Sequence, residues 1–193
     1  MSIREFGVAG DATDIVVKCE TCGAKRPMSD AFDTDEYKID CRGQVLYDLL
    51  ARAKHRIFLV TFAAHRVPLL CEHLGKAIDR GIQVTLLLES EQASAGQLSF
   101  DAAKAFKDLC LDKVRILYWP LEHRERNQAD KPGKLHVKCA LIDQTAIVGS
   151  ANLTDDAFNR NMEMGVIIKD PVVVTAIHAH FQTLERNGIL KHL

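Results

Sequence analysis

The sequence predicts a mixed α/β fold in which a mostly parallel mixed sheet lies between layers of helices, preceded by a small N-terminal appendage that contains cysteines. Two observations support this fold class. From residue 44 onward, short apolar segments of strand length alternate with segments of helical periodicity, and this alternation is typical of a buried sheet with helices on both faces. Residues 1–42 are polar and show no sustained period. We therefore expect an appendage over residues 1–42 and one α/β domain over residues 43–193.

The α/β domain begins with four elements that local signals define. Residues 44–53 place apolar side chains on one face of a helix, and residues 56–63 form an apolar segment typical of a buried strand. Pro68 begins a second helix and Gly81 follows its end, which are positions that proline and glycine favour. The apolar residues 83–88 predict the next strand.

The rest of the domain continues this alternation. The predicted elements, in chain order, are a helix over residues 100–109, a strand over 114–118, strands over 135–142 and 146–148 joined by a tight turn, a short helix over 156–159, a strand over 162–168, and a last helix that Asp170 and Pro171 begin and Gly188 ends. Thr154 or Asp155 supplies the cap of the short helix. Strands that alternate with helices in this way predict mostly parallel pairing.

Composition is that of a globular protein. Of the 193 residues, 47% are hydrophobic and 26% are charged, a balance that suits a chain with a sizeable core. The formal net charge of −1 gives no whole-molecule attraction to nucleic acid, so any basic surface must be local. The sequence contains no apolar run long enough for a bilayer and no signal-peptide pattern. We therefore expect a cytoplasmic location and no membrane partner.

The six cysteines are then expected to be thiols or metal ligands, because disulfides are rare in the cytoplasm. Cys71, Cys110 and Cys139 lie in apolar stretches and are interpreted as small buried hydrophobic residues.

Cys19-x-x-Cys22 together with Cys41 suggests a small structural zinc site in the appendage. The fourth ligand would be His55 or an acidic residue. Thiols without a metal remain the alternative.

The segment that begins at Leu135 combines an apolar strand pattern with two basic side chains. Alternate side chains of a strand point to opposite faces of the sheet. One face here is apolar and comprises Leu135, Val137, Cys139 and Leu141. His136 and Lys138 share the other face, where an imidazole and an ammonium group lie side by side at a cost in desolvation. The alternative is a pair of satisfied polar residues near a strand end.

Polar residues with matching chemistry follow this strand. Gly149 permits a sharp turn or a close approach to a ligand, and Ser150 and Asn152 place a hydroxyl and an amide just beyond the next strand. Glu163 lies between two methionines in an apolar run. A carboxylate there needs a partner, and an imidazole is a natural one.

In order and type, these residues resemble the HKD motif of the phospholipase D superfamily, which reads H-x-K, four residues, D, then G-S-x-N, then a downstream glutamate. The matching positions are His136, Lys138, Asp143, Gly149, Ser150, Asn152 and Glu163. Five residues separate Asp143 from Gly149, where the usual pattern has six, and this predicts a shorter turn at Gln144 and Thr145. The resemblance extends over about residues 44–190.

Within the superfamily, the chain looks most like the phospholipase-D-like component of bacterial DISARM anti-phage systems. This narrower resemblance rests on residues 88–90, 98–103, 149–154 and 160–165. The cysteine-containing residues 1–42 have no counterpart in it.

The resemblance implies a phosphodiesterase that forms a phosphohistidine intermediate and needs no metal or other cofactor for catalysis. His136 would attack phosphorus, and Glu163 would orient its imidazole through the second ring nitrogen. Asp143 would be a structural anchor near the strand end. The non-bridging oxygens would be held by Lys138, Ser150 and Asn152.

The sequence contains no second H-x-K, although a second histidine usually protonates the leaving oxygen in this superfamily. Two-fold association would supply it by pairing one surface with itself. We therefore expect an obligate homodimer with one composite site. A monomer that binds phosphate without turnover is the alternative.

The motif does not choose the substrate. Short members of the superfamily with one motif are commonly nucleases, so the expected partner is nucleic acid, with DNA ahead of RNA, and further subunits of a defence system are a second expectation. A phospholipid hydrolase or transferase is one alternative. A non-catalytic nucleic-acid-binding subunit of a defence complex is another.

A charged loop over residues 120–134 precedes the catalytic strand and contains His123, Arg124, Arg126, Lys131 and Lys134. These side chains would contact phosphates beside the scissile bond or form an ordinary solvated loop. Tyr118 and Trp119 would stack on bases or pack in the core.

Overall fold

The computed structural model describes residues 13–18, 44–89, 102–107, 109 and 111–193. These residues form an eight-stranded sheet in the order β1-β9-β7-β6-β2-β4-β5-β10, together with a two-stranded sheet of β3 and β8. The strands are β1 (Thr13–Lys18), β2 (Arg56–Thr61), β3 (Ala64–His65), β4 (Gln83–Leu88), β5 (Val114–Tyr118), β6 (Cys139–Ile142), β7 (Thr145–Gly149), β8 (Leu153–Thr154), β9 (Glu163–Ile168) and β10 (Lys191–His192). The helices are α1 (Gln44–Arg52), α2 (Pro68–Asp79), α3 (Asp155–Asn159) and α4 (Pro171–Arg186), with short 3₁₀ helices η1 (Ala102–Phe106), η2 (Leu111–Lys113) and η3 (Leu121–His123).

The sheet confirms the predicted mixed α/β class, but its pairing is mostly antiparallel. β2, β4 and β5 pair in parallel, whereas the other neighbours in the large sheet pair antiparallel. The expectation of a mostly parallel sheet is wrong because the second half has no crossover helices. A two-residue turn joins β6 to β7, since Ile142 pairs with Thr145, and such turns produce antiparallel neighbours.

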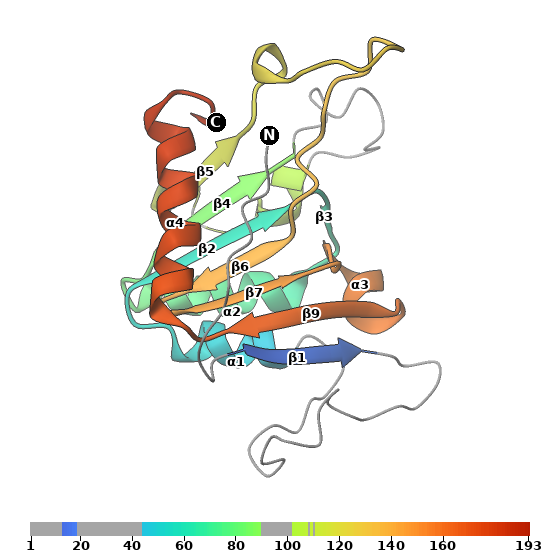
Figure 1. The fold of residues 1–193 in the computed structure, drawn as a ribbon. Helices are drawn as coiled ribbons and strands as arrows, with labels where there is room; N and C mark the ends of the chain where they lie inside the picture. The colour runs from blue at the N-terminus through green and yellow to red at the C-terminus, as the bar shows by residue number, and fades with distance from the viewer. Residues whose placement is uncertain (1–12, 19–43, 90–101, 108, 110) are drawn as a thin grey trace.

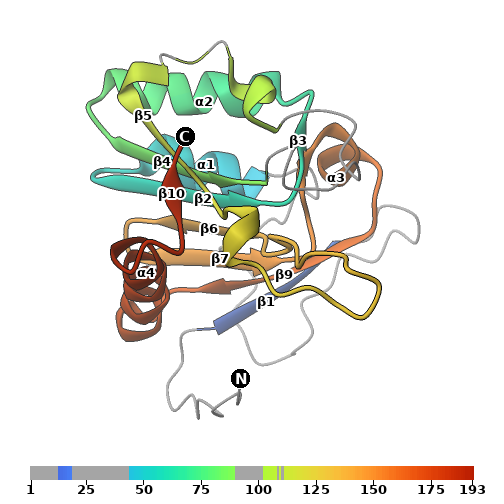
Figure 2. The same ribbon diagram turned by 90° about the horizontal axis from the view of Figure 1, so that it is seen from above.

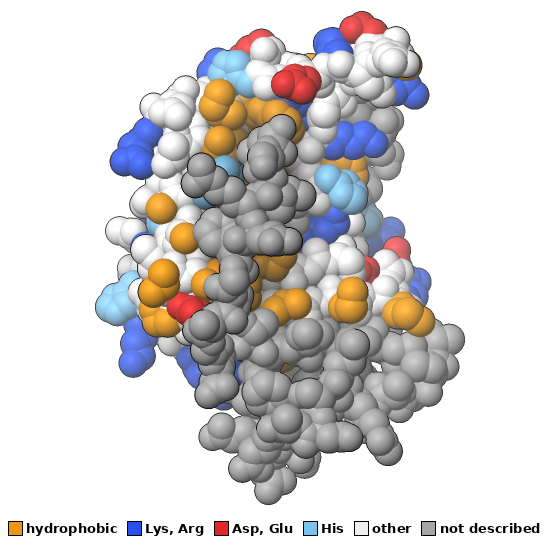
Figure 3. Space-filling model, viewed as in Figure 1, with side chains coloured by type: hydrophobic (Ala, Val, Ile, Leu, Met, Phe, Trp, Pro, Cys, Tyr) orange, Lys and Arg blue, Asp and Glu red, His pale blue; other side chains and the backbone are white. Residues whose placement is uncertain are grey.

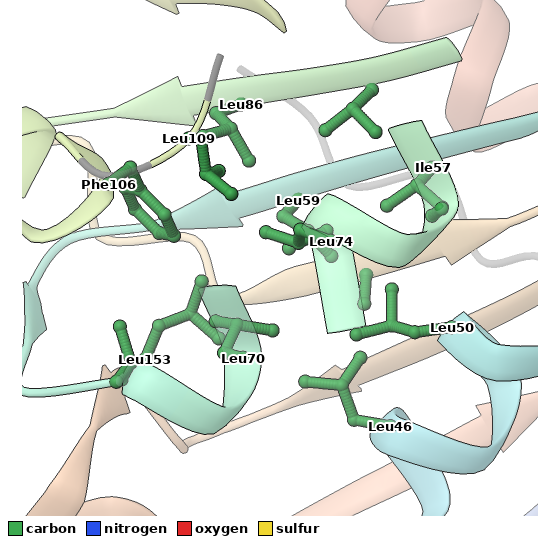
Figure 4. Close-up of a cluster of buried hydrophobic side chains, with 14 of the residues drawn as sticks. Leu46, Leu50, Ile57, Leu59, Leu70, Leu74, Leu86, Phe106, Leu109 and Leu153 are labelled. Carbon is green, nitrogen blue, oxygen red and sulfur yellow. The ribbon is translucent and has the colours of Figure 1, made fainter. Parts of the chain in front are cut away.

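Helices cover both faces of the sheet, as predicted (Figures 1 and 2). On one face, α1 and α2 pack Leu50, Leu70 and Leu74 against Ile57 and Leu59 of β2 (Figure 4). Burying such side chains contributes about 1.5–3 kcal/mol each to the free energy of unfolding.

On the other face, α4 places Val174 and Phe181 against Phe58 of β2. None of the helices described here is both long enough and apolar enough to cross a membrane.

Local signals define the helix ends. The Thr154 side chain accepts a hydrogen bond from the Ala157 N–H at the start of α3, and the Asp170 carboxylate accepts one from the Val172 N–H at the start of α4. Gly188, after α4, has φ of +70°, which glycine adopts without strain. Three of the predicted boundaries therefore rest on short-range chemistry.

Two predicted elements differ in the structure. Within the expected helix over residues 100–109, the described part is the 3₁₀ helix η1, Ala102–Phe106. The expected strand over residues 135–142 begins only at Cys139. The apolar face predicted for it holds at Leu135, Cys139 and Leu141, but Val137 is 43% exposed, because the β ladder begins only at Cys139, after that residue.

Strand β1 lies within the segment expected to be an appendage, and it pairs with β9 at the edge of the large sheet. Cys19, Cys22 and Cys41, the predicted zinc ligands, lie outside the described residues.

Candidate active site

Three segments that carry motif residues meet at one end of the sheet. His136 and Lys138 precede β6, Ser150 and Asn152 follow β7, and Glu163 begins β9. Because β6, β7 and β9 are successive antiparallel neighbours, the start of β6, the end of β7 and the start of β9 lie at the same end of the strands. The fold therefore brings together the motif residues that the sequence predicted as one site, apart from Asp143.

Gly149 allows these strands to approach closely. A Cβ atom at this position would lie 2.6 Å from the carbonyl oxygen of Met164 and 3.0 Å from the Cα atom of Gly165. With no Cβ, the Ser150 N–H donates to the Met164 carbonyl at 2.9 Å and the Gly149 N–H donates to the Lys138 carbonyl at 3.2 Å. Gly149 thus allows the backbone of β7 to lie close to that of β9, where the site residues are held.

His136 is exposed, and Lys138 is half-buried beside it. The His136 ring lies 5.5 Å from the ring of Phe62, measured between centroids, and the Lys138 Nζ donates to the His136 carbonyl at 2.9 Å. Desolvation lowers the pKa of Lys138 below its ordinary value, and the charge of Glu163 opposes that shift. Phe62 carried no sequence signal that linked it to the motif.

The Glu163 carboxylate is held by two neighbours. Ser150 Oγ donates to it at 2.5 Å, and Asn161 Nδ2 donates at 3.2 Å. The Ser150 hydroxyl also accepts the Met164 N–H at 3.0 Å. Among the described residues of the single chain, the carboxylate bonds to these groups and not to His136, the partner expected from the sequence.

The buried Thr61 hydroxyl fixes the loop that contains Asn152. Thr61 Oγ1 accepts the Leu153 N–H at 3.2 Å and donates to the Ala63 carbonyl at 2.8 Å. Asn152 Oδ1 is buried and has no hydrogen-bond partner among the residues that the structure describes. Such an atom is unusual in a folded protein, and it marks Asn152 as a side chain whose acceptor oxygen is unused within the described part of the chain.

Asp143 lies at the opposite end of β6, in the two-residue turn. Its carboxylate accepts the backbone N–H groups of Lys54, His55 and Arg56 at 2.8 to 3.0 Å. Partial burial raises the pKa of this carboxyl, but the three hydrogen bonds outweigh it, so the net pKa lies below the ordinary value. Its geometry is that of an anchor between the turn and the start of β2.

The loop over residues 120–134 does not present all of its cations to solvent. Arg124 is fully buried and paired with Glu89, with Nη2 to Oε1 at 2.8 Å. The guanidinium also lies 4.8 Å from the centre of the Trp119 ring. Arg124 is therefore unavailable to a phosphate, contrary to one of the two sequence interpretations, and Trp119 packs against it. Arg126, Lys131 and Lys134 are exposed.

Of the cysteines interpreted as small buried hydrophobic residues, Cys139 is buried, Cys71 is half-buried, and Cys110 lies outside the described residues. Burial raises the pKa of the Cys139 thiol to about 12, and the Cys71 thiol donates to the Ala105 carbonyl at 3.3 Å. Within the described residues, no group of three or more His, Cys, Asp or Glu side chains has metal-binding geometry.

Solved structures share this fold. NucT from Helicobacter pylori matches with a TM-score of 0.64 at 15% identity, over 78% of this chain and 89% of that one. The phospholipase D family member Nuc from Salmonella typhimurium matches with a TM-score of 0.57 at 19% identity, over 94% of this chain and 98% of that one. Phosphatidylserine synthase from Haemophilus influenzae matches with a TM-score of 0.58 at 15% identity, over 78% of this chain and 36% of that one.

Sequence comparison identifies the family. No curated protein matches the chain significantly. The family described as "Cardiolipin synthase, PLD-like domain" matches residues 46–185, which is more than half of the chain and includes every described motif residue. The chain therefore belongs to this family of phospholipase D-like domains.

Proposed function

We propose that this protein is a metal-independent phosphodiesterase, a nuclease that cleaves DNA through a phosphohistidine intermediate at His136. The observation that carries the proposal is the convergence of an exposed imidazole, an amine, a hydroxyl, an amide and a carboxylate at one sheet edge. These groups are His136, Lys138, Ser150, Asn152 and Glu163.

The chemistry follows from what a phosphodiester requires. A neutral His136 nitrogen attacks phosphorus, the P–N bond forms and the bond to the leaving oxygen breaks. Lys138 and the amide of Asn152 offset the charge of the non-bridging oxygens. The leaving oxygen takes a proton from a second histidine, and water then cleaves the P–N bond while that histidine accepts a proton. Glu163 stabilises positive charge at the site.

The second histidine is proposed to be His136 of a twin subunit in a homodimer. Large apolar side chains surround the site at unusual exposure: Val137 at 43%, Val148 at 38%, Met162 at 67% and Met164 at 59%. Figure 3 shows hydrophobic side chains along the surface formed by β9, with His and Lys or Arg side chains near them. An apolar patch around an incomplete site suits a surface that pairs with its own copy.

The dimer can be tested by placing a charge in this patch. Met164→Glu should shift the sedimentation coefficient to that of a monomer and abolish activity together. Val172→Glu is the matched control, because Val172 is 77% exposed on α4. A wild-type protein that sediments as a monomer while it turns over substrate would end the composite-site proposal.

Nucleic acid is preferred over phospholipid as the substrate on the likeness to Nuc and NucT, which the alignments cover more fully than phosphatidylserine synthase. The alignments span 98% of Nuc and 89% of NucT, but only 36% of phosphatidylserine synthase. We extend the proposal to a role in phage defence, where the cytoplasm would be the place of action and further defence subunits the partners. That extension rests on the sequence resemblance alone.

The decisive assay uses labelled DNA, labelled RNA and bis-p-nitrophenyl phosphate with excess EDTA. His136→Ala should reduce kcat by about 10⁴-fold or more, as loss of a nucleophile does. His180→Ala, which removes an exposed histidine on α4, should leave kcat unchanged. Activity retained by His136→Ala would exclude the mechanism. Headgroup release from liposomes without cleavage of DNA or RNA would favour the phospholipid hydrolase, and nucleic-acid binding without turnover would favour the non-catalytic subunit.

The zinc site stays a prediction separate from the chemistry. We propose that any zinc held by Cys19, Cys22 and Cys41 is structural. Metal analysis of the purified protein, compared with the Cys19→Ser variant, checks it directly.

A further inference from the structure

The segment that carries His136 has little regular structure of its own. Residues 135–138 lie before the first residue of β6, so no β ladder fixes them. Among the described residues, two hydrogen bonds join the backbone of this segment to other parts of the chain: the Leu135 N–H donates to Glu89 Oε2 at 3.0 Å, and the Lys138 carbonyl accepts the Gly149 N–H at 3.2 Å. His136 lies between these two points.

The first of these points is a fully buried ion pair. The side chains of Glu89 and Arg124 both have 0% exposure. Arg124 Nη1 donates to Glu89 Oε2 at 2.9 Å and Nη2 donates to Oε1 at 2.8 Å. The acceptor of the Leu135 N–H is thus a carboxylate whose position a bidentate guanidinium fixes.

Arg124 uses all five of its N–H donors. Besides the two bonds to Glu89, Nη1 donates to the Gly133 carbonyl at 3.1 Å, and Nε donates to the Trp119 carbonyl at 3.1 Å. Nη2 also donates to the Trp119 carbonyl. One guanidinium therefore joins Trp119, just before the loop, Gly133, near the end of the loop, and the carboxylate that accepts the Leu135 N–H. Lysine has three donors and could not replace it.

A buried ion pair is a poor way to gain stability, because apolar residues of similar volume often do as well. This ion pair accepts the N–H of Leu135, the residue next to His136, so its presence here needs a reason other than stability. We propose that Glu89 and Arg124 are positioning residues, which hold the backbone at Leu135 so that the His136 imidazole points at the scissile phosphorus. This inference rests on the proposed function of His136 and adds two residues that do not touch substrate.

The test compares two double variants without buried charge. Glu89→Gln with Arg124→Met keeps an oxygen that can accept the Leu135 N–H, whereas Glu89→Met with Arg124→Met removes it. We expect kcat to be about 10²-fold lower in the second variant than in the first, at unchanged KM, since a misplacement of about 1 Å costs this much. Equal kcat values in the two folded variants would overturn the proposal.

Loss of stability alone is controlled by Leu50→Ala. Leu50 is fully buried on α1, away from the site, so this substitution should cost about 2–5 kcal/mol of stability. Its kcat, measured well below its melting temperature, should equal that of the wild type. If Leu50→Ala loses kcat as strongly as the double variant Glu89→Met with Arg124→Met, the loss comes from general destabilisation, and the proposal that Glu89 and Arg124 position His136 is refuted.

Hydrogen exchange at the Leu135 amide separates this proposal from the proposed function. The wild-type amide should exchange slowly. The double variant Glu89→Met with Arg124→Met should lose that protection while core amides keep theirs. A wild type without phosphodiesterase activity would refute the function, and the exchange result would still decide whether Glu89 holds Leu135. If neither double variant folds, wild-type exchange alone decides: rapid exchange at Leu135 refutes the proposal, and exchange only through global unfolding supports it.

Discussion

The two ends of the three neighbouring strands β6, β7 and β9 each carry a carboxylate of the same sequence motif, and the two carboxylates differ in their partners. At the turn, Asp143 accepts three backbone N–H groups. At the open end, Glu163 is bonded to the side chains of Ser150 and Asn161 and acts electrostatically on Lys138. Backbone donors are part of the folded scaffold, whereas side-chain partners can rearrange around a ligand. We therefore propose that the motif combines one carboxylate for folding with one for chemistry.

The largest effect is expected at the open end. Glu163→Gln keeps the shape and the hydrogen bond from Ser150 but removes the charge that stabilises positive groups at the site. We expect kcat to fall by about 10³-fold, within the usual range for a group that assists proton transfer, while the melting temperature changes little. A variant that loses stability but keeps kcat would show that Glu163 is the structural carboxylate after all.

A smaller effect concerns the pH dependence set by Lys138. Because desolvation lowers its pKa, Lys138 loses its charge at a lower pH than an ordinary lysine, whose pKa is about 10.4. The alkaline limb of the kcat/KM profile should therefore fall below that value, and Lys138→Arg should move it upward. Glu163→Gln should move the limb further down, since the Glu163 charge favours the protonated amine. If neither substitution moves the alkaline limb of the kcat/KM profile, the limb reports the titration of a group other than Lys138.

The smallest effect on activity is expected at the turn. Asp143→Asn should lower the free energy of unfolding by about 1–3 kcal/mol through weakened charge-assisted hydrogen bonds, with kcat unchanged below the melting transition. Asp79→Asn, at an exposed position, is the matched control.

The Asp143 effect has a defined pH window. The pKa of Asp143 is lower in the folded state than in the unfolded state, so its contribution is complete above the unfolded value of about 3.9. It disappears as the pH falls through the folded pKa. Denaturant titrations at pH 7 and pH 2.5 should therefore show the wild type and Asp143→Asn converging in acid. A constant difference would contradict the role of the ionised carboxylate.

Short-range chemistry explains what the sequence could predict. Helix starts at Pro68 and Asp170 and the buried β2 and β4 strands follow from patterns within a few residues, whereas the grouping of the motif residues follows from the family resemblance. The sequence predicts a tight turn between β6 and β7 at Gln144 and Thr145; the structure has the two-residue turn one position earlier, at Asp143 and Gln144, since Ile142 pairs with Thr145.

Long-range partners explain what the sequence could not predict. The pairing of Glu89 with Arg124 joins residues 35 positions apart, and no local pattern distinguishes Arg124 from its exposed neighbours. The same applies to the tilted ring contact of Phe62 with His136 and to the direction of pairing in the second half of the sheet. Alternation of residues 135–138 suggested a strand, but a ladder needs a neighbour, and β7 pairs only from Cys139 onward.

The tip of the loop after Arg124 makes its own hydrogen bonds. The Asn127 N–H donates to the Lys131 carbonyl at 3.0 Å, the Asn127 side chain accepts the N–H groups of Ala129 and Lys131, and Arg126 pairs with Asp130. Figure 1 shows this segment extending beyond the sheet. The tip is therefore held by bonds within itself, so replacing residues 127–131 with a hairpin of other sequence should leave the Glu89–Arg124 pair, and the Leu135 N–H bonded to it, in place.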